Sequence, residues 1–198
     1  MKETRRSILQ AAEELLAQRG YAGCSLGMIA ERLNVSKGVV TYHFPQKDGI
    51  FRELIHGFYE DAAAYMAARL DPNGTAPAVL AAYIEANLRF VAERRVRTQA
   101  VMQLIANHRD KDGALVYAGG GDAIYRPLID IFRYGQDEEK SFRPFAPAMM
   151  ALFVRSAIDT ASGRLAAEAD ADIEEAVQET VRAFHYATRS VEHEEDPA

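Results

Sequence analysis

The sequence predicts an all-α protein of about nine helices, and three observations support this fold class. Apolar residues recur at spacings of three and four along most of the 198 residues, which is the period of one helix face. Alternating runs of Val, Ile and Thr, which are typical of strands, are nearly absent. The composition, 48% hydrophobic and 26% charged, is that of a globular chain able to build a sizeable core. The length fits one domain, or one domain with a small module.

Three short helices are predicted in the first 46 residues. The first spans residues 4–19 and should end at Gly20 in the left-handed conformation. The second spans residues 25–34, where the Ser25 hydroxyl can accept from a free backbone amide. The third spans residues 36–43, because Pro45 restricts the residue before it. A helix, a tight turn and a second helix therefore fit within residues 25–44.

The rest of the chain predicts six further helices. A long one runs over residues 47–70 and stops at an Asp-Pro-Asn-Gly break, and Pro127 is tolerated near the start of a later helix. The last two predicted helices, over residues 144–165 and 172–191, carry apolar stripes. The other five helices are expected over residues 75–95, 98–109, 122–134, 144–165 and 172–191.

Charge is distributed unevenly along the chain. The net charge is −6, yet residues 1–55 carry eight Lys or Arg and six Asp or Glu, which leaves +2 there and −8 on the remainder. A basic segment over residues 1–55, followed by an acidic remainder, is compatible with binding of a polyanion by residues 1–55.

The helix pair within residues 25–44 has the form of a helix-turn-helix, whose second helix can enter a DNA major groove. Val35 and Val39, four residues apart, are expected to pack on the first two helices. Small outward residues such as Thr41 would contact bases, whereas Lys37, Tyr42 and Lys47 suit phosphates. Lys47 also opens a helix whose free amides attract a phosphate. The same pattern also fits a plain αα-hairpin. The candidate DNA-binding residues are Ser25, Ser36, Lys37, Gly38, Val40, Thr41, Tyr42, His43 and Lys47.

The segment SLGMIAERLNVSKGVVTYHFPQKD, residues 25–48, resembles the signature of the TetR family of one-component transcriptional regulators. The shared features are the small polar cap, the Ile-Ala pair, Val-Ser-Lys-Gly, the aromatic-His-Phe run and the Lys-acid pair. Thr41 stands where many members carry an aromatic residue, and Asn34 where the family often has Gly. The resemblance implies a DNA-binding domain over residues 1–46 and an effector-binding and dimerisation domain over residues 47–198.

The resemblance further implies a homodimer that binds a near-palindromic, double-stranded operator and releases it when a small-molecule effector binds, more often as a repressor. Polar or aromatic residues facing inward are the candidates for effector contacts: Tyr83, Asn87, Phe90, Gln103, Asn107, Tyr117, Tyr125, Phe132, Arg155 and Asp159. Arg155 and Asp159 are four apart and can form an ion pair or anchor a charged effector. The dimer candidates on the last two helices are Met149, Phe153, Ile158, Val177, Val181 and Phe184.

Other segments resemble metal-binding or phosphate-binding motifs but lack residues that those motifs require. Residues 108–113 resemble a calcium loop, but its twelfth position is Gly119 instead of Glu. The glycines at 119–121 lack the strand and the Gly-Lys-Ser/Thr of a phosphate-binding loop, and His185 and His193 lack metal-ligand spacing. Cys24, the single cysteine, is expected to be a buried small hydrophobe.

We therefore expect no metal, no cofactor and no enzymatic activity. A charged start and the lack of an 18-residue apolar stretch favour a cytoplasmic protein without a membrane span. The alternatives are an enzyme with a helical pocket, a helical protein-interaction module, or a small-molecule-binding protein that does not bind DNA.

Overall fold

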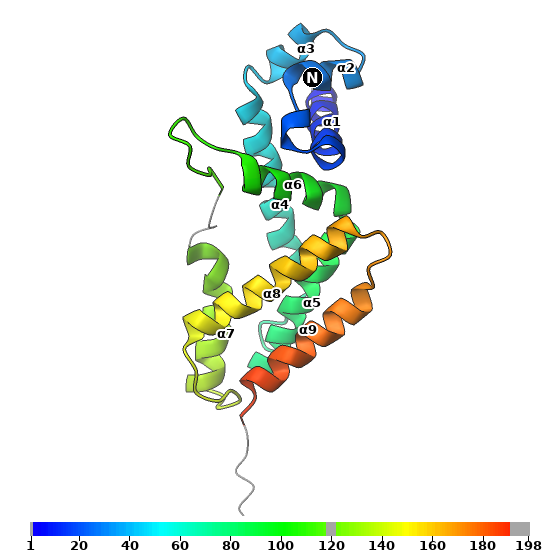
Figure 1. Cartoon of the computed structure of the whole chain (residues 1–198). Helices are drawn as coiled ribbons and strands as arrows, with labels where there is room; N and C mark the ends of the chain where they lie inside the picture. Colours follow the sequence, from blue (N-terminus) through cyan, green and yellow to red (C-terminus); the bar gives the residue numbers. More distant parts are fainter. Residues whose placement is uncertain (1, 118–121, 191–198) are drawn as a thin grey trace, which may run out of the picture. The chain divides into compact units, whose positions relative to one another are not determined.

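The computed structural model describes residues 2–117 and 122–190, and all regular structure in this part of the chain is helical (Figure 1). Extended backbone there is limited to two isolated bridges, Arg109 with Leu115 and Phe142 with Arg189. The all-α prediction is confirmed. The helices are α1 (Lys2–Arg19), η1 (Tyr21–Gly23), α2 (Leu26–Arg32), α3 (Lys37–His43), α4 (Lys47–Ala67), α5 (Ala76–Glu93), α6 (Arg95–Asn107), α7 (Asp122–Asp137), α8 (Pro147–Ala167) and α9 (Ile173–Thr188).

Helix boundaries follow local capping signals. Gly20 ends α1 with φ 71° and ψ −178°, a positive-φ conformation that glycine adopts readily, and not the αL conformation that was predicted. The Ser25 hydroxyl accepts from the Met28 amide at 3.2 Å and so caps α2, as predicted. Asn34, with φ 53°, makes the turn between α2 and α3. Asp172 caps α9 by accepting from two backbone amides.

Most helix ends differ from the predictions by one to three residues, and three of them illustrate this. α4 ends at Ala67, three residues before the predicted Leu70. α6 begins at Arg95 and not at residue 98, because the chain leaves helical geometry only at Arg94, where φ is −130° and ψ is 41°. α8 begins at Pro147, a residue type that fits the first helical position.

The chain divides into two compact units. The first unit comprises the described parts of residues 1–64, 91–119 and 166–169, and the second those of residues 65–90, 120–165 and 170–198. The first unit therefore holds α1 to α3, most of α4, and α6.

Each unit has its own core. In the first unit the predicted apolar face of α1 is buried, and so are Ile29, Ile50 and Phe51. In the second unit the Phe132 ring is fully buried and meets Phe142 and Phe145 at centroid distances of 5.8 and 5.2 Å. A Cβ at Gly135 would lie 2.3 Å from the Phe142 ring, so only glycine fits there.

No helix of the described residues is both long enough and apolar enough to cross a lipid bilayer.

Candidate nucleic-acid interface

The seven residues of α3 present a small, open and basic surface. Lys37 and Gly38 are exposed, and a Cβ added at Gly38 would meet only the Ser36 hydroxyl, at 3.6 Å. Tyr42 is 73% exposed although it is a large aromatic, and its ring meets that of the half-exposed His43 edge-on. Another molecule can therefore approach the backbone of α3 closely at its start and contact an aromatic ring near its end.

Val40 does not belong to this surface, and the prediction that its side chain contacts DNA is wrong. Val40 is 0% exposed, whereas Val35 and Val39, which were expected to pack inward, are each 37% exposed. Val40 and Phe44 are four apart and both face the core of the first unit. The spacing from Val35 misled because Val35 lies in the turn, where the helical period does not apply.

Thr41 is half-exposed, and its hydroxyl is turned toward its own helix. Thr41 Oγ1 donates to one of two carbonyl oxygens, of Lys37 at 3.1 Å or of Gly38 at 3.2 Å. With the hydroxyl engaged, the methyl group is the part of the side chain that is left to meet a thymine methyl.

The two serines next to the turn differ in their roles. Ser25 is exposed, but its hydroxyl already caps α2. Ser36 is the N-cap residue of α3, and its side chain makes no capping hydrogen bond there. The Ser36 hydroxyl is therefore available to donate a hydrogen bond to a phosphate, together with the free amides of the first turn of α3.

Lys47 lies at the start of α4, as predicted, but its ammonium group rests on aromatic rings of the first unit. Lys47 Nζ lies 4.9 Å from the centroid of Tyr21 and 5.6 Å from that of Phe51. These cation-π contacts hold a positive charge beside the N-terminus of α4. The Tyr21 hydroxyl in turn lies 2.9 Å from Nδ1 of the buried His108.

Two arginines that hold the helix pair in place were not found from the sequence. Arg5 pairs with Glu53, donates to the backbone oxygen of His43 at 3.1 Å and lies over the Phe44 ring. Arg32 of α2 pairs with Glu14 of α1. These partners lie 18 to 48 residues apart, and no local sequence signal marks them.

The predicted effector-contact residues fall in both compact units. In the first unit, Gln103 Oε1 accepts from the backbone amide of Tyr21 at 3.3 Å, Asn107 is exposed, and Tyr117 stacks on His108. The second unit contains the other seven residues. Of these, Tyr83, Phe90 and Phe132 are buried, Asn87, Tyr125 and Arg155 are partly buried, and Asp159 is exposed.

A polar cluster in the second unit joins several of these residues. Arg155 pairs with Asp159, and its Nη1 donates to Oδ1 of Asn87 at 3.1 Å. The Asn87 amide donates to the Tyr83 carbonyl oxygen at 2.8 Å. Burial acts against the charge of Arg155, but Asp159 and Tyr83 together raise its pKa. The ion pair anticipated from the spacing is therefore present, with Arg155 largely buried.

The predicted dimer residues divide into exposed and buried members. Met149 and Phe153 are 49% and 53% exposed on α8, and Val181 and Phe184 are half-buried. Ile158 and Val177 belong to the core of the second unit, so the prediction that they face a partner is wrong for both. A buried stripe and an exposed stripe run along the same helix, and hydrophobicity alone does not separate them.

The remaining sequence features are accounted for by local structure. Asp110 Oδ1 accepts from the amides of Asp112 and Ala114, so the calcium-like segment is a hydrogen-bonded turn. Within the residues that the structure describes, no group of three or more His, Cys, Asp or Glu could hold a metal ion. Residues 119–121 and His193 lie outside the described residues. Burial raises the pKa of the Cys24 thiol to about 11.

Comparisons with known proteins find matches for the segment that contains α2 and α3. Residues 8–54 match the family of bacterial regulatory proteins named tetR. The HTH-type transcriptional regulator BetI of Paraburkholderia phytofirmans is 32% identical over 92 residues, which is 43% of this chain and 47% of that protein. The matched segment thus spans about half the length of this curated relative.

Solved structures resemble the whole chain in fold. A tetR-family regulatory protein from Rhodococcus RHA1 has a TM-score of 0.79 at 19% identity, over 97% of this chain and 100% of that one. A transcriptional regulator from Saccharomonospora viridis, solved in complex with choline, has a TM-score of 0.80 at 23% identity, over 96% of this chain and 100% of that one. At these identities the likeness establishes the fold.

Proposed function

We propose that the chain is a ligand-responsive repressor of the TetR family of bacterial regulatory proteins, because residues 8–54 match that family and the whole chain shares the fold of a solved tetR-family protein. It binds a near-palindromic operator as a homodimer, with α3 of each protomer in a major groove. The observation that carries this function is the outward surface of α3: a basic residue, a glycine, a Thr methyl and a 73% exposed Tyr within seven residues. TetR-family proteins are regulators and not enzymes.

Each residue of this surface has a distinct role in DNA binding. Lys37 and the hydroxyl of Ser36 contact phosphates at the start of α3, where the free amides and the helix dipole favour an anion. Gly38 lets the backbone approach the base edges, and the methyl groups of Thr41 and Val39 contact thymine methyls. Tyr42 contacts the sugar-phosphate backbone with its exposed ring.

A homodimer supplies the second recognition helix. Met149, Leu152 and Phe153 form an exposed apolar stripe on α8 at spacings of three and four. A groove of about 680 Å³ between α8 and α9 continues it, with small residues such as Ala157, Ala161 and Ala176 in its lining. A second copy of this chain covers the stripe and places its α8 and α9 against the groove as a four-helix bundle.

Phe153→Glu tests the dimer directly. The charge would be buried in the bundle, so the variant is expected to elute as a monomer in size-exclusion chromatography with light scattering, with an unchanged helical circular dichroism spectrum. A variant that remains fully dimeric would refute this placement of the interface.

Effector binding in the second unit changes the affinity for DNA by favouring one arrangement of the two recognition helices, with α4 carrying the change. Choline, present in the Saccharomonospora viridis structure, is the first effector to test. The regulator works on DNA and hence in the cytoplasm.

Fluorescence anisotropy tests the proposed function. The purified protein is titrated against duplex DNA from upstream of its own gene and against a scrambled duplex, at several salt concentrations. Tighter, saturable and steeply salt-dependent binding to the native duplex is expected. A folded dimer that binds neither duplex at low salt would refute DNA binding and favour a helical protein-interaction module.

A further inference from the structure

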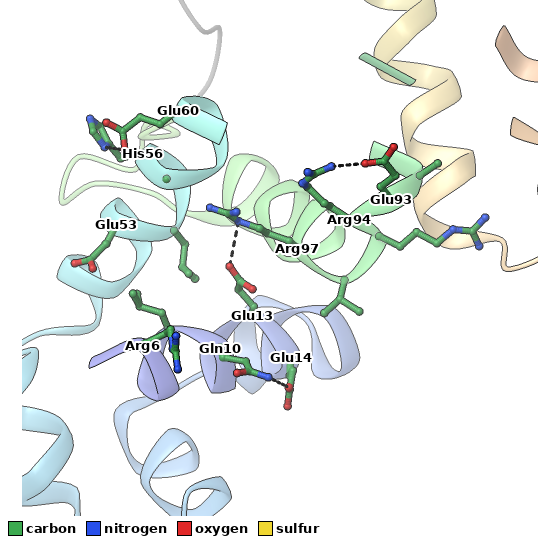
Figure 2. Close-up of a pocket in the computed structure, with 16 residues that line it drawn as sticks. Arg6, Gln10, Glu13, Glu14, Glu53, His56, Glu60, Glu93, Arg94 and Arg97 are labelled. Atoms are coloured by element: carbon green, nitrogen blue, oxygen red, sulfur yellow. Dashed lines mark hydrogen bonds and ion pairs between the residues drawn. The ribbon is translucent and has the colours of Figure 1, made fainter. Parts of the chain in front are cut away.

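The first unit contains a charged groove of about 970 Å³, lined by residues of α1, of α4 and of the junction of α5 with α6 (Figure 2). Glutamates of α1 and α4 line it together with arginines from residues 94–97. Two pairs among these charges are local in sequence, His56 with Glu60 and Glu93 with Arg94. Arg97 is different, because it connects three helices that are distant in the sequence.

Arg97 of α6 contacts one carboxylate on each of two other helices. Its Nε lies 3.3 Å from Oε1 of Glu13 on α1, the contact drawn in Figure 2, and its Nη1 pairs with Asp61 on α4. The guanidinium fits against α4 because Gly57 has no side chain: a Cβ there would lie 3.0 Å from Nη2. α1, α4 and α6 therefore meet at a single planar fork, which a lysine could not reproduce.

The energetics of this cluster are not those of a simple stabilising ion pair. Arg97 and Glu13 retain only 25% and 21% side-chain exposure, and burial raises the pKa of Glu13 although the charge of Arg97 opposes the shift. Arg97 Nε is buried, and its contact with Glu13 is too poorly aligned to be a hydrogen bond. Desolvation of such a pair offsets most of its Coulomb energy. Fixing the relative placement of helices is then the main effect of the contact.

The placement of α1 determines the placement of the recognition helix. Glu14, next to Glu13, pairs with Arg32 of α2. Arg5, nearer the start of α1, pairs with Glu53 of α4 and donates to the backbone oxygen of His43, the last residue of α3. A change in how α1 lies on α4 and α6 is thus transmitted to both helices of the helix-turn-helix, at the last residue of α2 and the last residue of α3.

We propose that Arg97, through Glu13 and Asp61, is a positioning residue for operator recognition: it sets the orientation of α1 on α4 and α6, and thereby that of α3. This role rests on the proposed function and goes beyond it, because Arg97 lies outside α2 and α3 and contacts no DNA in the proposed complex. It concerns selectivity for the native operator and not general affinity for DNA.

The sharpest test compares two neutralised carboxylates that are neighbours on α4. Asp61→Asn removes the negative charge that pairs with Arg97, while Glu60→Gln removes the same charge from a residue that pairs within its own helix, with His56. Both side chains are well exposed, 57% and 66%, so both variants should fold. Loss of a negative charge alone should tighten DNA binding. The proposal predicts the opposite for Asp61→Asn with the native upstream duplex: an affinity lower by about tenfold, or about 1.4 kcal/mol.

Binding of each variant is measured by anisotropy on the native and the scrambled duplex, with the melting temperature recorded for both. Asp61→Asn should lose affinity for the native duplex only, whereas Glu60→Gln should bind both duplexes at least as tightly as the wild type. Equal behaviour of the two variants would overturn the role of Arg97 while leaving DNA binding intact. A wild-type protein that does not distinguish the duplexes would overturn the proposed function itself.

Arg97 variants provide a second comparison. Arg97→Met and Arg94→Met each remove one positive charge from the same groove, and Arg94 pairs with its neighbour Glu93. Both should lose the same small amount of affinity for the scrambled duplex. Only Arg97→Met should lose the additional selectivity for the native duplex, and Arg97→Lys should restore it in part. A selectivity that is unchanged in a folded Arg97→Met protein would contradict the proposal.

Discussion

Val39 and Val40 are identical neighbours on α3 with opposite environments, and replacing each by Ala separates core packing from DNA contact. Val40 is 0% exposed and Val39 is 37% exposed. Val40→Ala removes two buried methyl groups, worth roughly 0.8 kcal/mol each in transfer free energy, and the cavity left behind brings the cost to about 2 kcal/mol. For a chain of this size that loss lowers the melting temperature by about 4–8 °C.

Val39→Ala should behave in the opposite way. Its side chain is 37% exposed, so truncation leaves no closed cavity, and the free energy of unfolding should change by less than about 1 kcal/mol, well below the loss in Val40→Ala. Removal of its methyl groups should instead reduce the affinity for the native duplex several-fold, with little effect on the scrambled duplex.

Thermal unfolding followed by circular dichroism and anisotropy on both duplexes give the two quantities for each variant. The reasoning is refuted if Val39→Ala is destabilised as much as Val40→Ala. It is equally refuted if Val40→Ala keeps the wild-type melting temperature but loses selectivity for the native duplex, because Val40 would then be a contact residue.

Four other experiments test DNA contacts and packing within residues 1–46. Lys37→Ala should weaken binding to native and scrambled duplexes alike and reduce the salt slope by about 1 for each phosphate that Lys37 neutralises, and an unchanged slope would exclude a phosphate at this residue. Because the Thr41 hydroxyl is bonded within α3, Thr41→Val should keep the base preference and Thr41→Ser should lose it in selection from randomised duplexes; the reverse ranking would assign the readout to the hydroxyl. Cys24, buried and with a pKa of about 11, should react slowly with iodoacetamide at pH 8 until denaturant unfolds the protein, and fast labelling of the folded chain would contradict its burial. The hydrogen bond from Arg32 lowers the pKa of Glu14, so this pair stabilises the fold above the ordinary carboxyl pKa, and the stabilisation disappears as the pH falls through the lowered value. The melting temperatures of wild type and Glu14→Gln should therefore differ at pH 7 and converge once the pH is below that lowered pKa.

Several parts of the site could be predicted because they depend on residues close together in sequence. Ser25 caps α2 through an amide three residues away, and Asn34 makes the turn through its own backbone conformation. The exposure of Lys37 and Tyr42 likewise follows from a short helix packed on one side. The buried face of α3 was assigned wrongly because it depends on how the turn orients α3 against α2 and the rest of the first unit. The spacing of apolar residues within α3 does not encode that orientation.

The sequence by itself determined the helical fold, the position of the helix-turn-helix and the outward basic residues, since helical period, capping and turn chemistry act over a few residues. The tertiary structure alone decided that Val40 is core, that Ile158 faces inward while Phe153 faces outward, and that Arg97 joins Glu13 to Asp61. Burial and ion pairing between distant residues depend on which helix faces meet, and the energy that selects those faces belongs to the packed unit as a whole, not to any single segment.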